Sequence, residues 1–147
     1  MPDGYEVELV AAEPLTVDPV AIDWDASGRL WVVEMADYPS GMDNNGKPGG
    51  RVRVLEDTDG DGRYEKSTLF ADGLNFPTGL LTWRDGVIVT AAPDILFLKD
   101  SDGDGKADIV WHHATTGEVW VWLMNGTTRL SATWVGAVPD IGYQIAG

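Results

Sequence analysis

The chain has 147 residues, of which 44% are hydrophobic and 23% are charged, a balance typical of one globular domain rather than of a disordered chain. Its 24 acidic and 10 basic residues give a net charge of -14, so the surface should repel nucleic acid and anionic membranes and attract cations. Cysteine is absent, which excludes disulfides, thiolate metal sites and cysteine nucleophiles. We expect no membrane-spanning helix and no signal peptide, and the localisation stays open.

Short apolar runs alternate with glycine, proline, aspartate and asparagine along the whole sequence, and no segment shows a sustained helical stripe. This pattern is typical of short strands joined by tight turns. It predicts about twelve strands, near residues 5–11, 20–24, 30–35, 51–56, 66–71, 79–83, 87–91, 95–99, 107–112, 118–124, 130–135 and 143–146.

A segment that combines a strand with an acidic turn occurs twice. Residues 52–63 return as residues 95–106, which is 43 positions later. Upstream, Pro19 recurs as Pro77 at a longer offset, because the first copy contains an additional loop at 36–50 that is rich in glycine, proline and asparagine. A unit of about 43 residues with four short strands has the size of a propeller blade.

We therefore predict an all-β fold, a single domain of about three four-stranded β-propeller blades. The blades are expected at about 18–74, 76–116 and 117–147, the last together with the strand at 5–11. A plain β-sandwich with a chance duplication is the alternative. Three blades cannot close a ring, because propellers use about four to eight. We expect a homodimer of about six blades, in which the strand at 5–11 of one subunit completes the last blade of the other.

The repeated turn has the pattern of a calcium site. Both copies read D-x-D-x-D-G-x-x-[D/E], in which acidic oxygens at positions 1, 3, 5 and 9 converge only if the backbone turns sharply at the glycine. The carbonyl at position 7 supplies a further oxygen, and an all-oxygen flexible loop favours Ca²⁺ over magnesium, zinc or copper. The predicted ligands are Asp57, Asp59, Asp61, Arg63 and Glu65 in the first loop, and Asp100, Asp102, Asp104, Lys106 and Asp108 in the second.

Neither loop is an EF-hand, since position 12 holds Thr68 or Trp111 in place of a glutamate and strands are expected on both sides. Clustered carboxylates repel one another by on the order of a kcal/mol or more per pair, and a bound dication removes this repulsion. The alternative is a solvated acidic turn without an ion, which the repetition in one register disfavours. We expect the second loop to bind more tightly, because Asp108 is a commoner last ligand than the longer Glu65.

Several stretches carry a resemblance to a known family: 13–15 (EPL), 18–25 (DPVAIDWD), 28–35 (GRLWVVEM), 38–39 (YP), 49–52 (GGRV), 55–62 (LEDTDGDG) and 76–79 (FPTG). Through them, residues 4–108 resemble the N-terminal propeller blades of bacterial membrane-bound dehydrogenases, which are similar to soluble quinoprotein sugar dehydrogenases. The resemblance implies propeller blades and, in complete members, a quinone cofactor site whose residues come from the whole ring.

A second set of stretches carries a resemblance to a different type of repeat: 104–111 (DGKADIVW), 116–119 (TGEV), 122–127 (WLMNGT), 138–140 (VPD) and 143–145 (YQI). Through them, residues 100–147 resemble an FG-GAP or VCBS-type calcium-binding propeller repeat, a type found in secreted and adhesive proteins. The two resemblances meet in the acidic loop at 100–108. They imply a chimera, made by recombination or by design, or a truncated gene product, with a divergent natural protein as the alternative.

The predicted function is a non-catalytic, calcium-binding propeller fragment that assembles with itself and in which Ca²⁺ stabilises the two acidic loops. Enzyme activity is not expected, because only about two of the blades of a quinoprotein ring are represented. The alternatives are a secreted adhesion or glycan-binding module, and a remnant of a quinoprotein sugar dehydrogenase. The expected partner is a second copy of the chain, not nucleic acid or membrane, and any glycan or protein ligand stays open.

Overall fold

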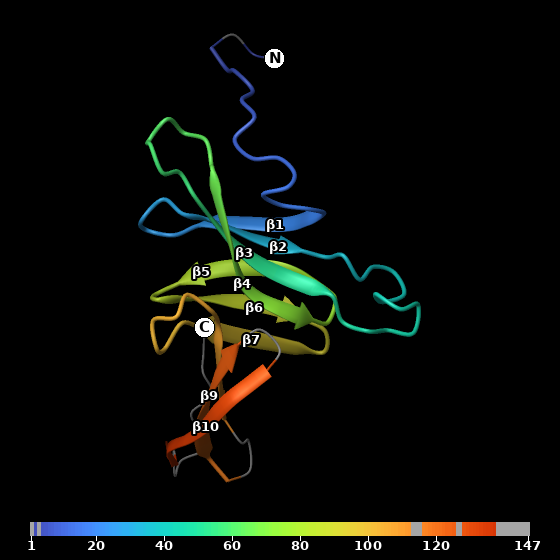
Figure 1. Cartoon of the computed structure of the whole chain (residues 1–147), viewed down its shortest axis with the longest axis vertical. Coiled ribbons are helices and arrows are strands. Elements are labelled where there is room, and N and C mark those ends of the chain that lie inside the picture. The colour runs from blue at the N-terminus through green and yellow to red at the C-terminus, as the bar shows by residue number, and fades with distance from the viewer. Residues whose placement is uncertain (1, 3, 113–115, 126–127, 138–147) are drawn as a thin grey trace.

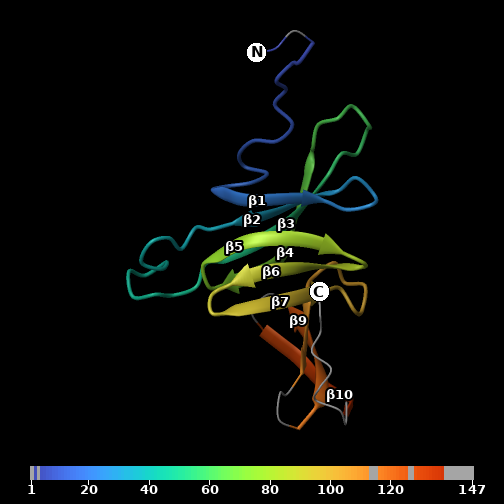
Figure 2. The same ribbon diagram turned by 180° about the vertical axis from the view of Figure 1, so that it is seen from behind.

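The computed structural model of the chain describes residues 2, 4–112, 116–125 and 128–137 (Figures 1 and 2). All ten regular elements in these residues are strands, which confirms the all-β prediction. The strands pair antiparallel in two open sheets. A search of the described residues for a helix suited to crossing a membrane finds none.

The first sheet contains four strands in chain order and lies within the segment expected for the first blade. Its strands are β1 (Pro19–Trp24), β2 (Leu30–Glu34), β3 (Gly50–Glu56) and β4 (Lys66–Leu74). All five residues of β2 are buried, because the second sheet covers one side of this strand and residues of the N-terminal segment cover the other.

The second sheet continues in chain order through six strands. They are β5 (Pro77–Trp83), β6 (Gly86–Ala91), β7 (Asp94–Lys99), β8 (Asp108–His112), β9 (Glu118–Asn125) and β10 (Thr128–Ala137). The division expected near residue 116 falls in the β8–β9 connection, inside this one sheet, because β8 and β9 pair from Ile109↔Trp122 to His112↔Val119. Pairing of β8 with β7 is short and spans only Leu98↔Ile109 and Lys99↔Asp108.

The main core lies between the two sheets. The ring of Trp31 meets that of Phe70 edge to face, with centroids 4.8 Å apart. The buried members of this core are Trp31, Val33, Val52, Val54, Phe70 and Ala71 from the first sheet, Val87, Val89 and Leu98 from the second sheet, and Ala107 from the loop between β7 and β8. The packing of the sheets places the β3–β4 and β7–β8 connections on the same side of the molecule, the left in Figure 1 and the right in Figure 2.

The N-terminal segment covers part of the outer side of the first sheet. Ala11 and Leu15 pack on a second cluster formed by Leu30, Val32 and Leu55. The strand predicted at 5–11 is not formed here, because the segment meets the sheet through isolated hydrogen bonds rather than a ladder: the Tyr64 N–H donates to the Val10 carbonyl (2.9 Å). The last predicted strand, at 143–146, lies outside the described residues.

Asp23 joins the two sheets and gives folding a pH dependence. Its Oδ2 accepts hydrogen bonds from the backbone N–H and the hydroxyl of Thr82, both at 2.8 Å. These bonds, the backbone one first, hold the pKa of Asp23 below its ordinary value. Because the folded pKa is the lower one, the stabilisation is complete above the unfolded pKa of about 4 and is lost as the pH falls through the folded pKa.

We therefore expect the melting temperature to fall on acidification below about pH 4, and Asp23→Asn to reduce that fall. Thermal melts of both proteins from about pH 7 to about pH 2 provide the measurement. An identical acid dependence in the variant and the parent protein would remove Asp23 as its source.

Candidate metal sites

The first acidic loop, residues 57–65, connects β3 to β4. Gly60 and Gly62 have φ angles of 81° and 91°, a region that costs other residues about 1–2 kcal/mol. These turns bring both backbone N–H groups onto one carboxylate: Asp57 Oδ1 accepts from Gly60 (2.6 Å) and Oδ2 accepts from Gly62 (2.9 Å). The two donors, Gly62 first, hold the pKa of Asp57 below its ordinary value.

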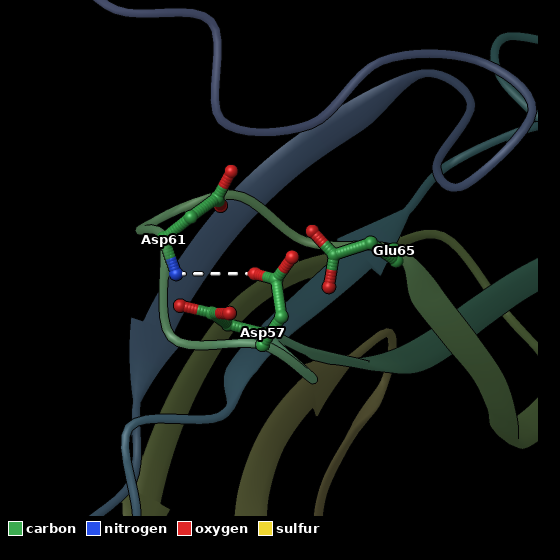
Figure 3. A group of neighbouring side chains, drawn as sticks. Asp57, Asp61 and Glu65 are labelled. Carbon is green, nitrogen blue, oxygen red and sulfur yellow. Dashed lines mark hydrogen bonds between the residues drawn. The ribbon is translucent and has the colours of Figure 1, made fainter.

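The other acidic side chains of this loop are fixed in the same way. Asp59 accepts from the Asp61 N–H (3.2 Å), Asp61 accepts from the Arg63 N–H (2.8 Å), and Glu65 accepts from the backbone and hydroxyl of Thr58. One carboxylate oxygen from each of Asp57, Asp59, Asp61 and Glu65 lies within 4.8 Å of the others. Figure 3 shows the labelled side chains of Asp57, Asp61 and Glu65 gathered at this loop.

The second acidic loop, residues 100–108, repeats this frame between β7 and β8. Asp100 accepts from Gly103 (2.7 Å) and Gly105 (3.0 Å), and these glycines have φ angles of 83° and 81°. Asp102 accepts from the Asp104 N–H (3.2 Å), and Asp104 accepts from the Lys106 N–H (2.9 Å). Each bond matches, within about 0.1 Å, the bond of the first loop at the position 43 residues earlier.

The two loops differ at the ninth position. Asp108 is fully buried, and its two oxygens accept from the backbone N–H groups of Ser101 (2.8 Å) and Met124 (3.0 Å). The group of mutually close oxygens in the second loop therefore consists of Asp100, Asp102 and Asp104, without Asp108. Asp108 has a role that the spacing alone does not indicate, because its contact with Met124 ties the loop to β9.

Lys106 also distinguishes the second loop. Its ammonium donates to Asn125 Oδ1 (2.6 Å) and lies 3.8 Å from Asp104. A cation at this distance competes with a metal for the same carboxylate. The first loop thus has four converging carboxylates, whereas the second has three and a nearby ammonium. This difference favours tighter binding in the first loop, although the sequence favoured the second. The carbonyls of Arg63 and Lys106 remain predicted ligands.

The arrangement can hold a metal ion in each loop. A carboxylate oxygen has two acceptor sites, so an oxygen that accepts one N–H can still coordinate a cation. The backbone hydrogen bonds orient the carboxylates before any ion arrives. They also offset only part of the repulsion among these negative groups, so a cation would be attracted to either loop.

A comparison with known protein families identifies the family of this chain. Residues 1–118 match a family described as Domain of unknown function (DUF7133). The chain belongs to this family. The match includes both acidic loops and ends at Glu118, the first residue of β9. No curated protein and no solved structure matches the chain.

Proposed function

We propose that this member of the family is a non-catalytic calcium-binding module built of propeller-type blades. The observation that carries the proposal is the repetition of one hydrogen-bonded acidic loop, at the same place between the third and fourth strands of two successive antiparallel arrays. A solvated turn would not need the same carboxylate orientations twice. Ca²⁺ in each loop would fix the β3–β4 and β7–β8 connections.

The donor set favours calcium over other cations. The converging atoms are carboxylate oxygens, which suit calcium and magnesium rather than zinc or copper. Calcium accepts about six to eight oxygens in irregular geometry, whereas magnesium needs a strict octahedron that an open turn does not impose. Water and loop carbonyls can complete the coordination sphere.

The loops are attached to the core, so ion binding can be transmitted to the sheets. The residue after position 7 of each loop donates its N–H to the neighbouring layer: Tyr64 to the Val10 carbonyl and Ala107 to the Phe70 carbonyl (2.9 and 2.8 Å). Ala107 is itself buried in the main core. Ordering of a loop by Ca²⁺ therefore stabilises contacts between layers as well as the turn.

We expect saturating Ca²⁺ to raise the melting temperature, with about 1–2 kcal/mol of stabilisation per site at millimolar calcium. Calorimetric titration and thermal melts should detect two sites, the tighter of which is removed by Asp57→Asn and the weaker by Asp100→Asn. Zinc and magnesium are the comparison ions.

Asp94→Asn is a matched control, because Asp94 is an exposed carboxylate at the start of β7 and outside both loops. It should leave the calcium response intact. A melting temperature that is unchanged by calcium, in the parent protein and both loop variants, would overturn the proposal. A signal on a glycan array, or dye reduction with added quinone cofactor, would instead favour one of the other two functions.

A further inference from the structure

We propose that two copies of the chain join head to tail, with the outer face of the second sheet of each copy packed on the outer face of the first sheet of the other. This rests on the proposed function, because it treats each sheet as one blade of a radial assembly. The partner is a second copy, and the junction between copies repeats the interface between the two sheets of one chain.

The repeat defines equivalent positions in the two sheets. Leu98 lies 43 residues after Leu55, and the strand registers then extend this pair into rows across the neighbouring strands. The two equivalent rows are Trp24–Leu30–Leu55 in the first sheet and Thr82–Val87–Leu98 in the second.

These equivalent rows lie on opposite sides with respect to the core. Val87 and Leu98 face the first sheet in the main core, whereas Leu30 and Leu55 belong to the separate cluster on the far side of the first sheet. The two sheets therefore pack front to back, as successive blades do, and not as a symmetric face-to-face pair. Front-to-back packing leaves one outer face unused on each sheet. These two faces are the equivalents of the two faces that already meet between the sheets, so they can pack on each other in the same way.

Each unused face carries exposed apolar side chains on its first strand, β1 or β5, whereas the N-terminal segment covers the first sheet near Leu30 and Leu55. On β1 of the first sheet, the outward side chains Val20, Ile22 and Trp24 are 47%, 51% and 51% exposed. On the second sheet, Leu81 is 55% exposed and shares its row with Ile88 and Phe97. Exposed apolar rows on both ends of a sandwich indicate interaction surfaces.

The internal interface predicts which residues meet. Inside the chain, Asp23 of β1 contacts Thr82 of β5. By equivalence, Asp23 corresponds to Leu81, and Thr82 corresponds to Trp24. At the junction between copies, Leu81 of one copy should therefore meet Trp24 of the other, so that an apolar pair stands where the chain has a hydrogen-bonded pair.

The N-terminal segment fits the same arrangement. The Val10 carbonyl accepts a hydrogen bond from the Tyr64 N–H, and the Phe70 carbonyl of β4 accepts one from the Ala107 N–H. Ala107 is the position equivalent to Tyr64 in the second copy of the repeat, 43 residues later. The segment thus lies where the fourth strand of a preceding blade would lie. The described part of β8 leaves β7 after Leu98↔Ile109, so a docked second sheet has room for this segment beside Ile95, which is 74% exposed.

Thiol cross-linking tests the interface, since the parent chain has no cysteine. We expect an equimolar mixture of Trp24→Cys and Leu81→Cys to form a covalent dimer on oxidation or with a short thiol-reactive linker. Each variant alone should remain uncoupled, because a head-to-tail interface does not bring like positions together. Leu130→Cys, on exposed β10, is the matched control and should not couple to Trp24→Cys.

Light scattering of the unmodified chain should give twice the 15.9 kDa mass of one chain. Leu81→Lys should give the mass of one chain and should keep the calcium-dependent rise in melting temperature. A monomeric mass for the parent chain at all calcium and protein concentrations would overturn this inference, as would coupling of Trp24→Cys with itself. Loss of the calcium response in a dimer of the expected mass would instead overturn the proposed function alone.

Discussion

Replacement of Asp108 by alanine should lower the free energy of unfolding by about 3 kcal/mol, even without calcium. Asp108 is fully buried and accepts from the N–H groups of Ser101 and Met124. Hydrogen bonds to a charged group contribute about 1.5–3 kcal/mol each, and the alanine would leave both part-buried N–H groups without this acceptor. Urea denaturation at neutral pH in the presence of a chelator provides the measurement.

Glu65→Ala is the matched control for this prediction. Glu65 occupies the same place in the first loop and accepts from Thr58 in the same way, but it is exposed. Water can replace it, so its removal should cost less than about 1 kcal/mol in calcium-free buffer. Equal losses in the two variants would contradict the claim that burial gives Asp108 its structural role.

Glu34→Ala should lower the free energy of unfolding by about 3–5 kcal/mol, because it removes one partner of a buried ion pair and leaves the other. Glu34 is 1% exposed, and its carboxylate lies 3.0 Å from Arg53 Nε on the neighbouring strand. It also accepts from the Val17 N–H (2.8 Å), which attaches the N-terminal segment to the first sheet. The alanine variant would leave a partly buried guanidinium and a backbone donor without this partner.

Glu56→Ala provides the comparison, since Glu56 pairs with Lys66 at the surface. Exposed pairs contribute about 0–1 kcal/mol, so this variant should unfold close to the parent protein. Urea unfolding of both variants, with hydrogen exchange at residues 11–17, separates a global loss of stability from detachment of the segment. If Glu34→Ala unfolds no earlier than Glu56→Ala, the buried pair is not a major source of stability.

The fold class and most strands could be predicted from sequence, because both depend on local patterns. Alternation of apolar residues with turn residues placed β1 to β10 within a few residues of their observed positions. The segment at 5–11 alternates as clearly, with Tyr5, Val7 and Leu9 apolar, yet it forms no strand here. A strand needs an adjacent edge to pair with, and that edge is not encoded in the alternation.

The acidic loops were determined by the sequence itself, because turns closed by aspartate and glycine depend on residues only two to seven positions apart. Only the tertiary structure decided that Asp108 is buried beneath β9, that Lys106 reaches Asn125, and that Leu55 and Leu98 lie on opposite sides relative to the core. Those outcomes depend on where distant strands pack, and packing depends on the whole chain, whereas a tight turn is specified by its own few residues.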